Sequence, residues 1–289
     1  MSRLRVLFLL TAMLALAAFA GCGEDDDSDS GSETAATVSL DDCTPDQLET
    51  LKSGVLTVGT DKPAFPPYFE DNDPTNGKGF ESATAYAIAA QLGFDPSDVE
   101  WTVVPFNASY APGPKDFDFD VNQISITPKR AEQVDFSAPY YEAEQAVVVK
   151  KGGELDGVSS LAELQDATIG VQIGTTSLDA VNDVIQPSSE PQVFDTSNDV
   201  VSAFKNGQVD AIVVDVPTAY FLTAVQVPDG TIAGQFAAPG GDEWGALLEK
   251  DSALTDCVSA AIAALNESGE LPAIEKKWMS DVTSAPVLE

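Results

Sequence analysis

The sequence predicts an α/β fold divided into two lobes, and three observations lead to this prediction. Strand-like apolar runs alternate with segments of helical periodicity along most of the chain, which is typical of β-α-β units with sheets covered by helices. The stretch 43–289 is longer than one α/β core requires, so two lobes are expected. No internal repeat of solenoid length is present.

The N-terminus has the pattern of a secretion signal. Arg3 and Arg5 precede an apolar run, Val6 to Ala20, and small residues follow. The run is too short for a membrane span, so residues 1–21 are predicted to be a signal peptide of an exported protein. Phe19-Ala20-Gly21-Cys22 resembles a bacterial lipobox, which implies lipidation of Cys22. Ordinary signal-peptidase cleavage nearby is the alternative.

Residues 22–42 follow as an acidic linker. The segment is rich in Asp, Glu, Ser, Gly and Thr and has no strand or helix period. Such a composition cannot offset its ordering entropy by burial, so we predict a flexible spacer.

Strands and helices are expected in alternation beyond the linker. The apolar runs predict strands at Val55–Gly59, Val99–Phe106, Phe117–Ile126, Ala146–Val149, Thr168–Ile173, Ala211–Val214 and Trp244–Leu248. Apolar residues at helical spacing predict helices at Phe80–Leu92, Ser177–Ile185 and Asp251–Asn266. Gly93 follows the first of these helices as a suitable C′ residue. In sheets of this kind, ligands bind beyond the carboxyl ends of the strands.

Charge and composition narrow the possible chemistry. The chain has 14 Lys and Arg, 47 Asp and Glu and no histidine, for a net charge of −33. The missing histidine excludes Ser-His-Asp relays, His-ligated metals and an imidazole base. The negative charge argues against nucleic acid as a partner. Carboxylate chemistry, or binding without catalysis, remains.

Two cysteines remain if Cys22 carries lipid. Cys43 and Cys257 form an even pair in an exported protein, where disulfides persist. A disulfide between them is therefore predicted, and two buried free thiols are the alternative.

Six motifs occur in the order of a known family. They are Val58-Gly59-Thr60-Asp61 with Phe65-Pro66-Pro67, Gly79-Phe80-Glu81, Ile126 to Tyr141 (ITPKR, VDFS and PYY), Gly170 to Thr176 (GVQIGTT), Gly207 to Asp215 (GQVDA with the later Asp), and Glu275-Lys276-Lys277-Trp278. Together they resemble the family 3 extracellular solute-binding proteins, the polar amino-acid receptors of ABC importers. The resemblance covers about residues 51–280.

The resemblance implies a fold and a function. The fold is the two-lobed, type II periplasmic-binding-protein fold, with a mixed sheet flanked by helices in each lobe and a ligand cleft between the lobes. Lobe 1 is expected at 43–143 and 240–289 and lobe 2 at 144–239, with crossings near Glu142–Gln145 and Pro239–Asp242. The implied function is capture of a polar, basic or amide amino acid for an ABC permease by a monomer without catalysis, cofactor or metal. The membrane is contacted only through the lipid. A cyclohexadienyl dehydratase-like enzyme on the same fold is the alternative.

The resemblance also implies the residues that line the cleft. They are Asp61, Phe65, Phe106, Asn122, Gln123, Ser125, Arg130, Gln172, Thr175, Thr176 and Asp215. A guanidinium suits a ligand carboxylate, a carboxylate after a strand suits an ammonium, and aromatic rings suit the apolar part.

Several of these residues have a second interpretation. Arg130 can form a surface ion pair with Glu132 or Asp135, and Asp215 can cap the helix that starts at Pro217. Thr175 or Thr176 can act only as an N-cap, and the two phenylalanines can belong to the core. Asp61 can accept backbone N–H bonds in its own loop.

Two acidic segments are predicted to hold no metal. The segment from Asp71 begins like a calcium loop but has Asn76 and Ser82 where glycine and glutamate are needed. Asp116, Asp118 and Asp120 alternate with apolar residues, which predicts a strand with one solvent-exposed face.

Overall fold

The computed structural model describes residues 38–289. The predicted signal peptide, Cys22 and most of the predicted linker lie outside the described residues. Residues Thr37–Glu289 form one unit. Within the described part of the chain, no helix is both long enough and apolar enough to cross a membrane.

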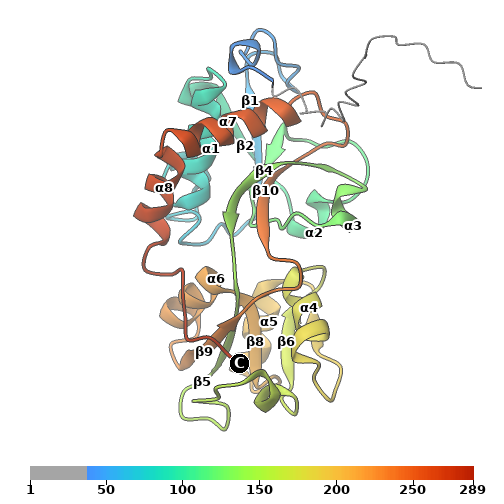
Figure 1. Cartoon of the computed structure of the whole chain (residues 1–289), viewed down its shortest axis with the longest axis vertical. Coiled ribbons are helices and arrows are strands. Elements are labelled where there is room, and N and C mark those ends of the chain that lie inside the picture. The colour runs from blue at the N-terminus through green and yellow to red at the C-terminus, as the bar shows by residue number, and fades with distance from the viewer. Residues whose placement is uncertain (1–37) are drawn as a thin grey trace, which may run out of the picture. The chain divides into compact units, whose positions relative to one another are not determined.

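A first five-stranded sheet has the order β2-β1-β3-β10-β4 (Figure 1). Its strands are β1 (Leu56–Thr60), β2 (Val99–Val103), β3 (Phe119–Asp120), β4 (Asp135–Glu142) and β10 (Glu243–Leu248). The first three strands are parallel, and β10 runs antiparallel to β3 and β4. The predicted mixed sheet is therefore present.

A second five-stranded sheet has the order β7-β6-β8-β5-β9. Its strands are β5 (Gln145–Lys150), β6 (Ile169–Gln172), β7 (Gln192–Phe194), β8 (Ala211–Asp215) and β9 (Gly230–Phe236). Strand β6 is parallel to β7 and β8, whereas β5 is antiparallel to β8 and β9. Here too the sheet is mixed.

Helices cover both sheets. The helices are α1 (Phe80–Gln91), α2 (Phe106–Ser109), α3 (Pro128–Ala131), α4 (Thr176–Ala180), α5 (Ser197–Lys205), α6 (Val216–Phe221), α7 (Thr255–Glu267) and α8 (Glu270–Met279). Single π-helical turns continue α4 through Ile185 and α6 through Gln226. Short 3-10 turns lie at Leu40–Asp42, Pro74–Asn76, Pro96–Asp98 and Leu161–Leu164.

Alternate residues of the strands face two different cores. In β5, Val147 and Val149 pack with the α4 segment, whereas Ala146 and Val148 pack with residues of α5 and α6. In the first sheet, Leu248 packs in the core that contains Ile88 of α1, Val258 of α7 and other buried residues of α1, α7 and α8. Burial on both faces explains why these strands read as continuous apolar runs in the sequence.

The chain passes between the two sheets after β4 and again after β9. Strand β4 ends at Glu142 and β5 begins at Gln145, while β9 ends at Phe236 and β10 begins at Glu243. The crossings touch, because the N–H of Ala143 donates to the carbonyl of Asp242 at 2.8 Å. The lobe boundaries themselves stay a prediction.

The last residues of the chain differ from the predicted division, which assigned all of 240–289 to lobe 1. The N–H of Gln235 in β9 donates to the carbonyl of Pro286 at 2.7 Å, and the N–H of Leu288 donates to the carbonyl of Gln235 at 2.9 Å. Leu288 is buried in a core of the second sheet. Gly234 permits this approach, because a Cβ atom there would lie 2.6 Å from Leu288. The C-terminal residues therefore add to the open edge of β9.

A disulfide joins Cys43 to Cys257 of α7, with Cα atoms 5.6 Å apart. It closes a loop across 214 positions and fastens the segment before β1 to the helical layer. A cross-link of this kind typically stabilises a protein by about 2–4 kcal/mol.

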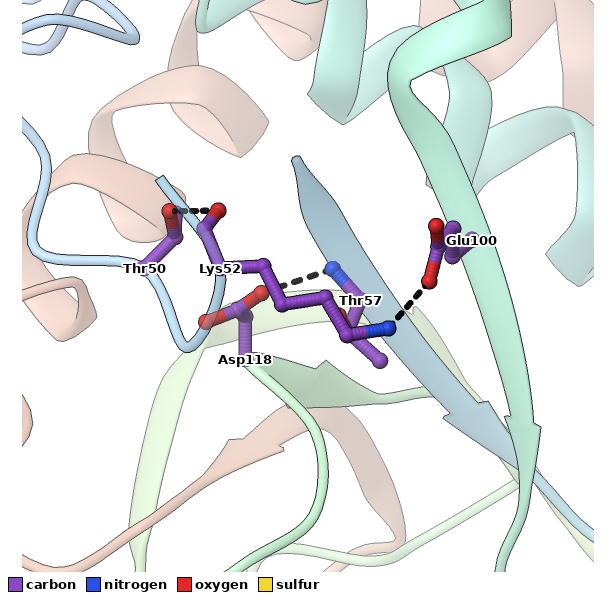
Figure 2. Close-up of polar contacts among 5 residues, drawn as sticks. All are labelled: Thr50, Lys52, Thr57, Glu100 and Asp118. Carbon is purple, nitrogen blue, oxygen red and sulfur yellow. Dashed lines mark hydrogen bonds and ion pairs between the residues drawn. The ribbon is translucent and has the colours of Figure 1, made fainter. Parts of the chain in front are cut away.

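The predicted strand Phe117–Ile126, with its wet face, is wrong. Only Phe119–Asp120 pairs as a strand, and Asp118 and Asp120 are buried. Asp118 accepts hydrogen bonds from the backbone nitrogens of Leu51 at 2.8 Å and Thr57 at 2.6 Å. Figure 2 shows Asp118 beside Thr57 and the exposed ion pair between Lys52 and Glu100. The carboxylate is inside because it satisfies backbone donors at the entry to β1.

The end of β2 and the start of α7 also differ from the prediction. The strand predicted to reach Phe106 stops at Val103, since Pro105 supplies no N–H and precedes α2. Helix α7 begins at Thr255 rather than Asp251, which has φ of 61°. Strands β4, β7 and β9 were not among the predicted strands.

Candidate functional site

A cavity of about 470 Å³ lies among the strand ends and loops of both sheets. Every residue that the resemblance implied as cleft-lining does line this cavity: Asp61, Phe65, Phe106, Asn122, Gln123, Ser125, Arg130, Gln172, Thr175, Thr176 and Asp215. Asp61 directly follows β1, Gln172 ends β6 and Asp215 ends β8. This placement agrees with the rule that ligands bind beyond the carboxyl ends of strands.

Arg130 supplies the buried positive charge of the cavity. It lies on α3 and is 7% exposed. Its Nη1 donates to the carbonyl of Ser125 at 2.7 Å and its Nη2 to the carbonyl of Gly174 at 2.8 Å, so it joins the two walls. Tyr110 lies over the guanidinium at 4.7 Å from ring centre to Cζ. Burial lowers the pKa of Arg130, but a guanidinium remains charged at neutral pH.

The alternative surface ion pair of Arg130 is wrong. Asp135 pairs instead with Lys250 at 3.1 Å. Two of the five guanidinium N–H groups bind carbonyls, which leaves donors for an incoming anion.

Asp215 supplies a half-buried carboxylate on the opposite wall. It occupies the N-cap position of α6, but its side chain makes no capping bond there, so the cap interpretation is not confirmed. Its Oδ1 accepts from Nε2 of Gln145 at 2.8 Å. Burial, followed by the nearby charge of Asp242, raises the pKa of Asp215 well above its usual value. A cationic ligand group would oppose both effects, because a nearby positive charge favours the ionised carboxylate.

The two threonines after Gly174 have different roles. The Thr175 hydroxyl caps α4 by accepting from the N–H of Leu178 at 3.2 Å, so its N-cap interpretation is confirmed. The Thr176 hydroxyl instead donates to Oδ2 of Asp242 at 2.8 Å and lies 3.2 Å from the hydroxyl of Ser125.

Aromatic rings close another part of the cavity. Phe65 faces Phe221 with ring centres 5.2 Å apart, although the two residues follow strands of different sheets. The hydroxyl of Tyr68 lies 2.8 Å from that of Thr218. These pairs give the cavity apolar walls with a polar edge.

Two further predicted residues, Asp61 and Gln123, already form hydrogen bonds within the protein. Asp61 accepts from the N–H of Lys62 at 2.6 Å and the N–H of Phe106 at 3.1 Å, as its alternative interpretation anticipated. Gln123 has φ of 50°, and its backbone N–H donates to Oε1 of Glu81 at 2.7 Å. The Nδ2 atom of Asn122 is buried without a hydrogen-bond partner among residues 38–289.

Comparison with known proteins identifies the family. The family model for bacterial extracellular solute-binding proteins, family 3, matches residues 56–281. The chain belongs to this family.

Relatives of this solute-binding protein are named for amino acids. It is 30% identical over 230 residues to the arginine-binding extracellular protein ArtP of Bacillus subtilis (78% of this chain, 86% of the relative). It is 29% identical over 234 residues to the L-cystine-binding protein TcyJ of Escherichia coli K12 (80% and 85%). An ancestral arginine-binding protein solved with glutamine matches with a TM-score of 0.66 at 32% identity (79% and 99%).

These findings confirm the predicted fold class and the family resemblance. The relatives are described as binding proteins, which agrees with the prediction of a protein without catalysis. Across the described residues, no group of three acidic or cysteine side chains could hold a metal ion.

Sequence reasoning missed four polar residues of this solute-binding protein. Glu81 is fully buried, and its Oε1 accepts a hydrogen bond from the Tyr140 hydroxyl at 2.6 Å. Burial raises the pKa of Glu81 to about 7. Gln145 and Asp242 form a buried network behind Thr176, and Tyr68 lines the cavity. Glu81 lies within a quoted motif, whereas Gln145 and Asp242 gave no signal except their places at the crossings.

Proposed function

We propose that this protein captures a polar amino acid with a basic or amide side chain and delivers it to an ABC permease. A single observation carries the proposal: one cavity is lined by a buried guanidinium, Arg130, and a half-buried carboxylate, Asp215. A free α-amino acid presents a carboxylate and an ammonium, which match these two groups. The names of the relatives support the amino-acid class.

The size of the cavity favours a long side chain. At about 30 Å³ for each molecule of liquid water, the volume corresponds to roughly 16 waters. An amino-acid head group uses only a few of these places. A small amino acid would leave most of the cavity filled with water, so a longer ligand is the better fit.

The charges around the cavity favour a cationic or amide end. Among the described residues that line it, Asp61, Asp195 and Asp215 are acidic, and Lys62 and Arg130 are basic. If Arg130 binds the ligand carboxylate and Asp215 binds the ligand ammonium, two aspartates, Asp61 and Asp195, and one lysine, Lys62, remain for the ligand side chain. A ligand with a second positive charge or an amide donor suits this balance better than an acidic one.

Capture requires a ligand that touches both walls. Arg130 comes from the side of the first sheet, and Thr176 and Asp215 come from the second. Only a ligand that contacts both gains affinity for the closed arrangement, which the permease then recognises. We further propose that the protein is a monomer anchored outside the cytoplasmic membrane through lipid on Cys22.

Thermal unfolding with each of the twenty amino acids tests the proposal. At about 100 times the dissociation constant, a bound ligand adds ~2.7 kcal/mol, which shifts the midpoint by roughly 5–11 °C for a chain of this size. We expect shifts with basic or amide amino acids. No shift with any of the twenty would overturn the proposal.

A further inference from the structure

Two aspartates beside the cavity, the buried Asp242 and the half-buried Asp215, accept hydrogen bonds from one side-chain amide. Nε2 of Gln145 donates to Oδ1 of Asp215 at 2.8 Å and to Oδ2 of Asp242 at 2.7 Å. Oε1 of Gln145 accepts from the hydroxyl of Ser177 at 2.6 Å, which holds the amide in this orientation. Gln145 and Asp242 are 0% and 1% exposed. One amide nitrogen therefore bridges the two carboxyl groups, of which that of Asp242 is buried and that of Asp215 lines the cavity.

No ion pair neutralises this pair of aspartates within residues 38–289. The positive group that faces them is Arg130, and its guanidinium donates to backbone carbonyls. Two carboxylates that share a buried site cannot both ionise easily.

The other titratable groups around the pair add no positive charge. Glu81, Tyr68 and Tyr141 face Asp215, and Glu144 faces Asp242. Burial raises the pKa of both aspartates, while hydrogen bonds from the neighbouring amide and hydroxyl groups oppose the rise.

Asp242 also contacts residues that line the cavity. It lies in the second crossing, directly before β10, and accepts from the hydroxyl of Thr176 at 2.8 Å. That hydroxyl lies 3.2 Å from the hydroxyl of Ser125, on the side of the first sheet. Asp242 itself does not line the cavity, so any effect on a ligand passes through Asp215 and Thr176.

We propose that Asp215 and Asp242 act as one pair that shares a single proton while the cleft is empty and releases it when a ligand ammonium binds. The charge balances, because one positive charge enters the site and one proton leaves for solvent. Asp242 is then a positioning residue for capture. This inference rests on the proposed function, because it takes an ammonium as the group that reaches Asp215.

Proton release can be measured by calorimetry with L-arginine as the probe. Titrations near pH 6 in two buffers with different ionisation enthalpies report the number of protons released for each L-arginine bound. We expect release from the wild-type protein and at most half as much from Asp242→Asn. As the pH is lowered from 7 to 5, the affinity of the wild-type protein for L-arginine should fall more steeply than that of Asp242→Asn. Where one full proton is released on binding, the affinity changes by up to tenfold per pH unit.

The control is Asp46→Asn, which removes one exposed carboxylate far from the pair in the sequence and should match the wild type in both measurements. Circular dichroism of each variant reports whether it is folded. Equal proton release and equal pH slopes in Asp242→Asn and wild type would overturn the inference.

A ligand-free measurement separates this inference from the proposed function. If no amino acid binds the wild-type protein, the proposed function fails, and carbon-13 NMR of the aspartate carboxyl groups still tests the pair. Coupling predicts that the titration midpoint of Asp215 falls in Asp242→Asn. An unmoved midpoint of Asp215 would overturn the shared proton.

Discussion

Replacement of Arg130 by lysine keeps the positive charge but removes the planar pair of donors. A hydrogen bond to a charged group contributes about 1.5–3 kcal/mol, and lysine offers a point charge in place of a bidentate contact. Loss of one such bond to a ligand carboxylate should weaken binding by roughly 10- to 150-fold. Arg130→Ala loses both bonds and the charge, so its binding should fall by several hundredfold or more.

Isothermal titration calorimetry with the amino acid that gives the largest thermal shift measures these losses. Lys129→Ala is the matched control, since Lys129 is the adjacent residue on α3 and is exposed; its dissociation constant should equal that of the wild type. Arg130 also bonds the carbonyls of Ser125 and Gly174, so the melting temperature of each variant is measured first. A folded Arg130→Ala variant that binds within threefold of the wild type would refute the carboxylate assignment.

Three further perturbations have defined outcomes. Gly174→Ala should weaken binding at least tenfold and also lower the melting temperature, because φ is 75° and a Cβ atom would lie 2.4 Å from the Tyr110 hydroxyl; normal affinity would show that this approach of the walls is unimportant. Glu81→Gln should flatten the dependence of stability on pH in urea titrations. The folded-state pKa is raised from 4.5 to about 7, so the stabilising effect of the bound proton is complete below pH 4.5 and is lost as the pH rises to 7, by about 3 kcal/mol. An unchanged slope in the variant would contradict this. Cys43→Ser with Cys257→Ser should lower the free energy of unfolding by about 2–4 kcal/mol, and a smaller loss than 1 kcal/mol would show that the disulfide contributes little.

The sequence predicted most of the fold because local patterns agree with the tertiary structure. The apolar runs of β5 and β8 are buried on both faces, so periodicity and burial coincide. Asp118, directly before β3, and Asp120 in β3 did not follow this rule. Asp118 accepts a hydrogen bond from the backbone of Thr57, and Asp120 packs against Gly59. The residue spacing along the chain does not identify Thr57 or Gly59 as the partner of either aspartate.

The candidate site was predictable where its residues lie in motifs. Arg130 and Asp215 are in quoted segments, and both line the cavity. Asp242 has no motif, because its role depends on the two crossings meeting behind Thr176. The contact of residues 284–289 with β9 was also unpredictable, since a short C-terminal segment shows which sheet edge it joins only after folding.

The central claim is that one ligand molecule uses both the guanidinium of Arg130 and the carboxylate of Asp215. Calorimetric titration of the wild-type protein with L-arginine, with agmatine, which lacks the α-carboxylate, and with N-acetyl-L-arginine, which lacks the α-ammonium, tests it most directly. The account predicts tight binding of L-arginine and losses of at least 100-fold for both analogues. Binding of either analogue as tightly as L-arginine would contradict the account.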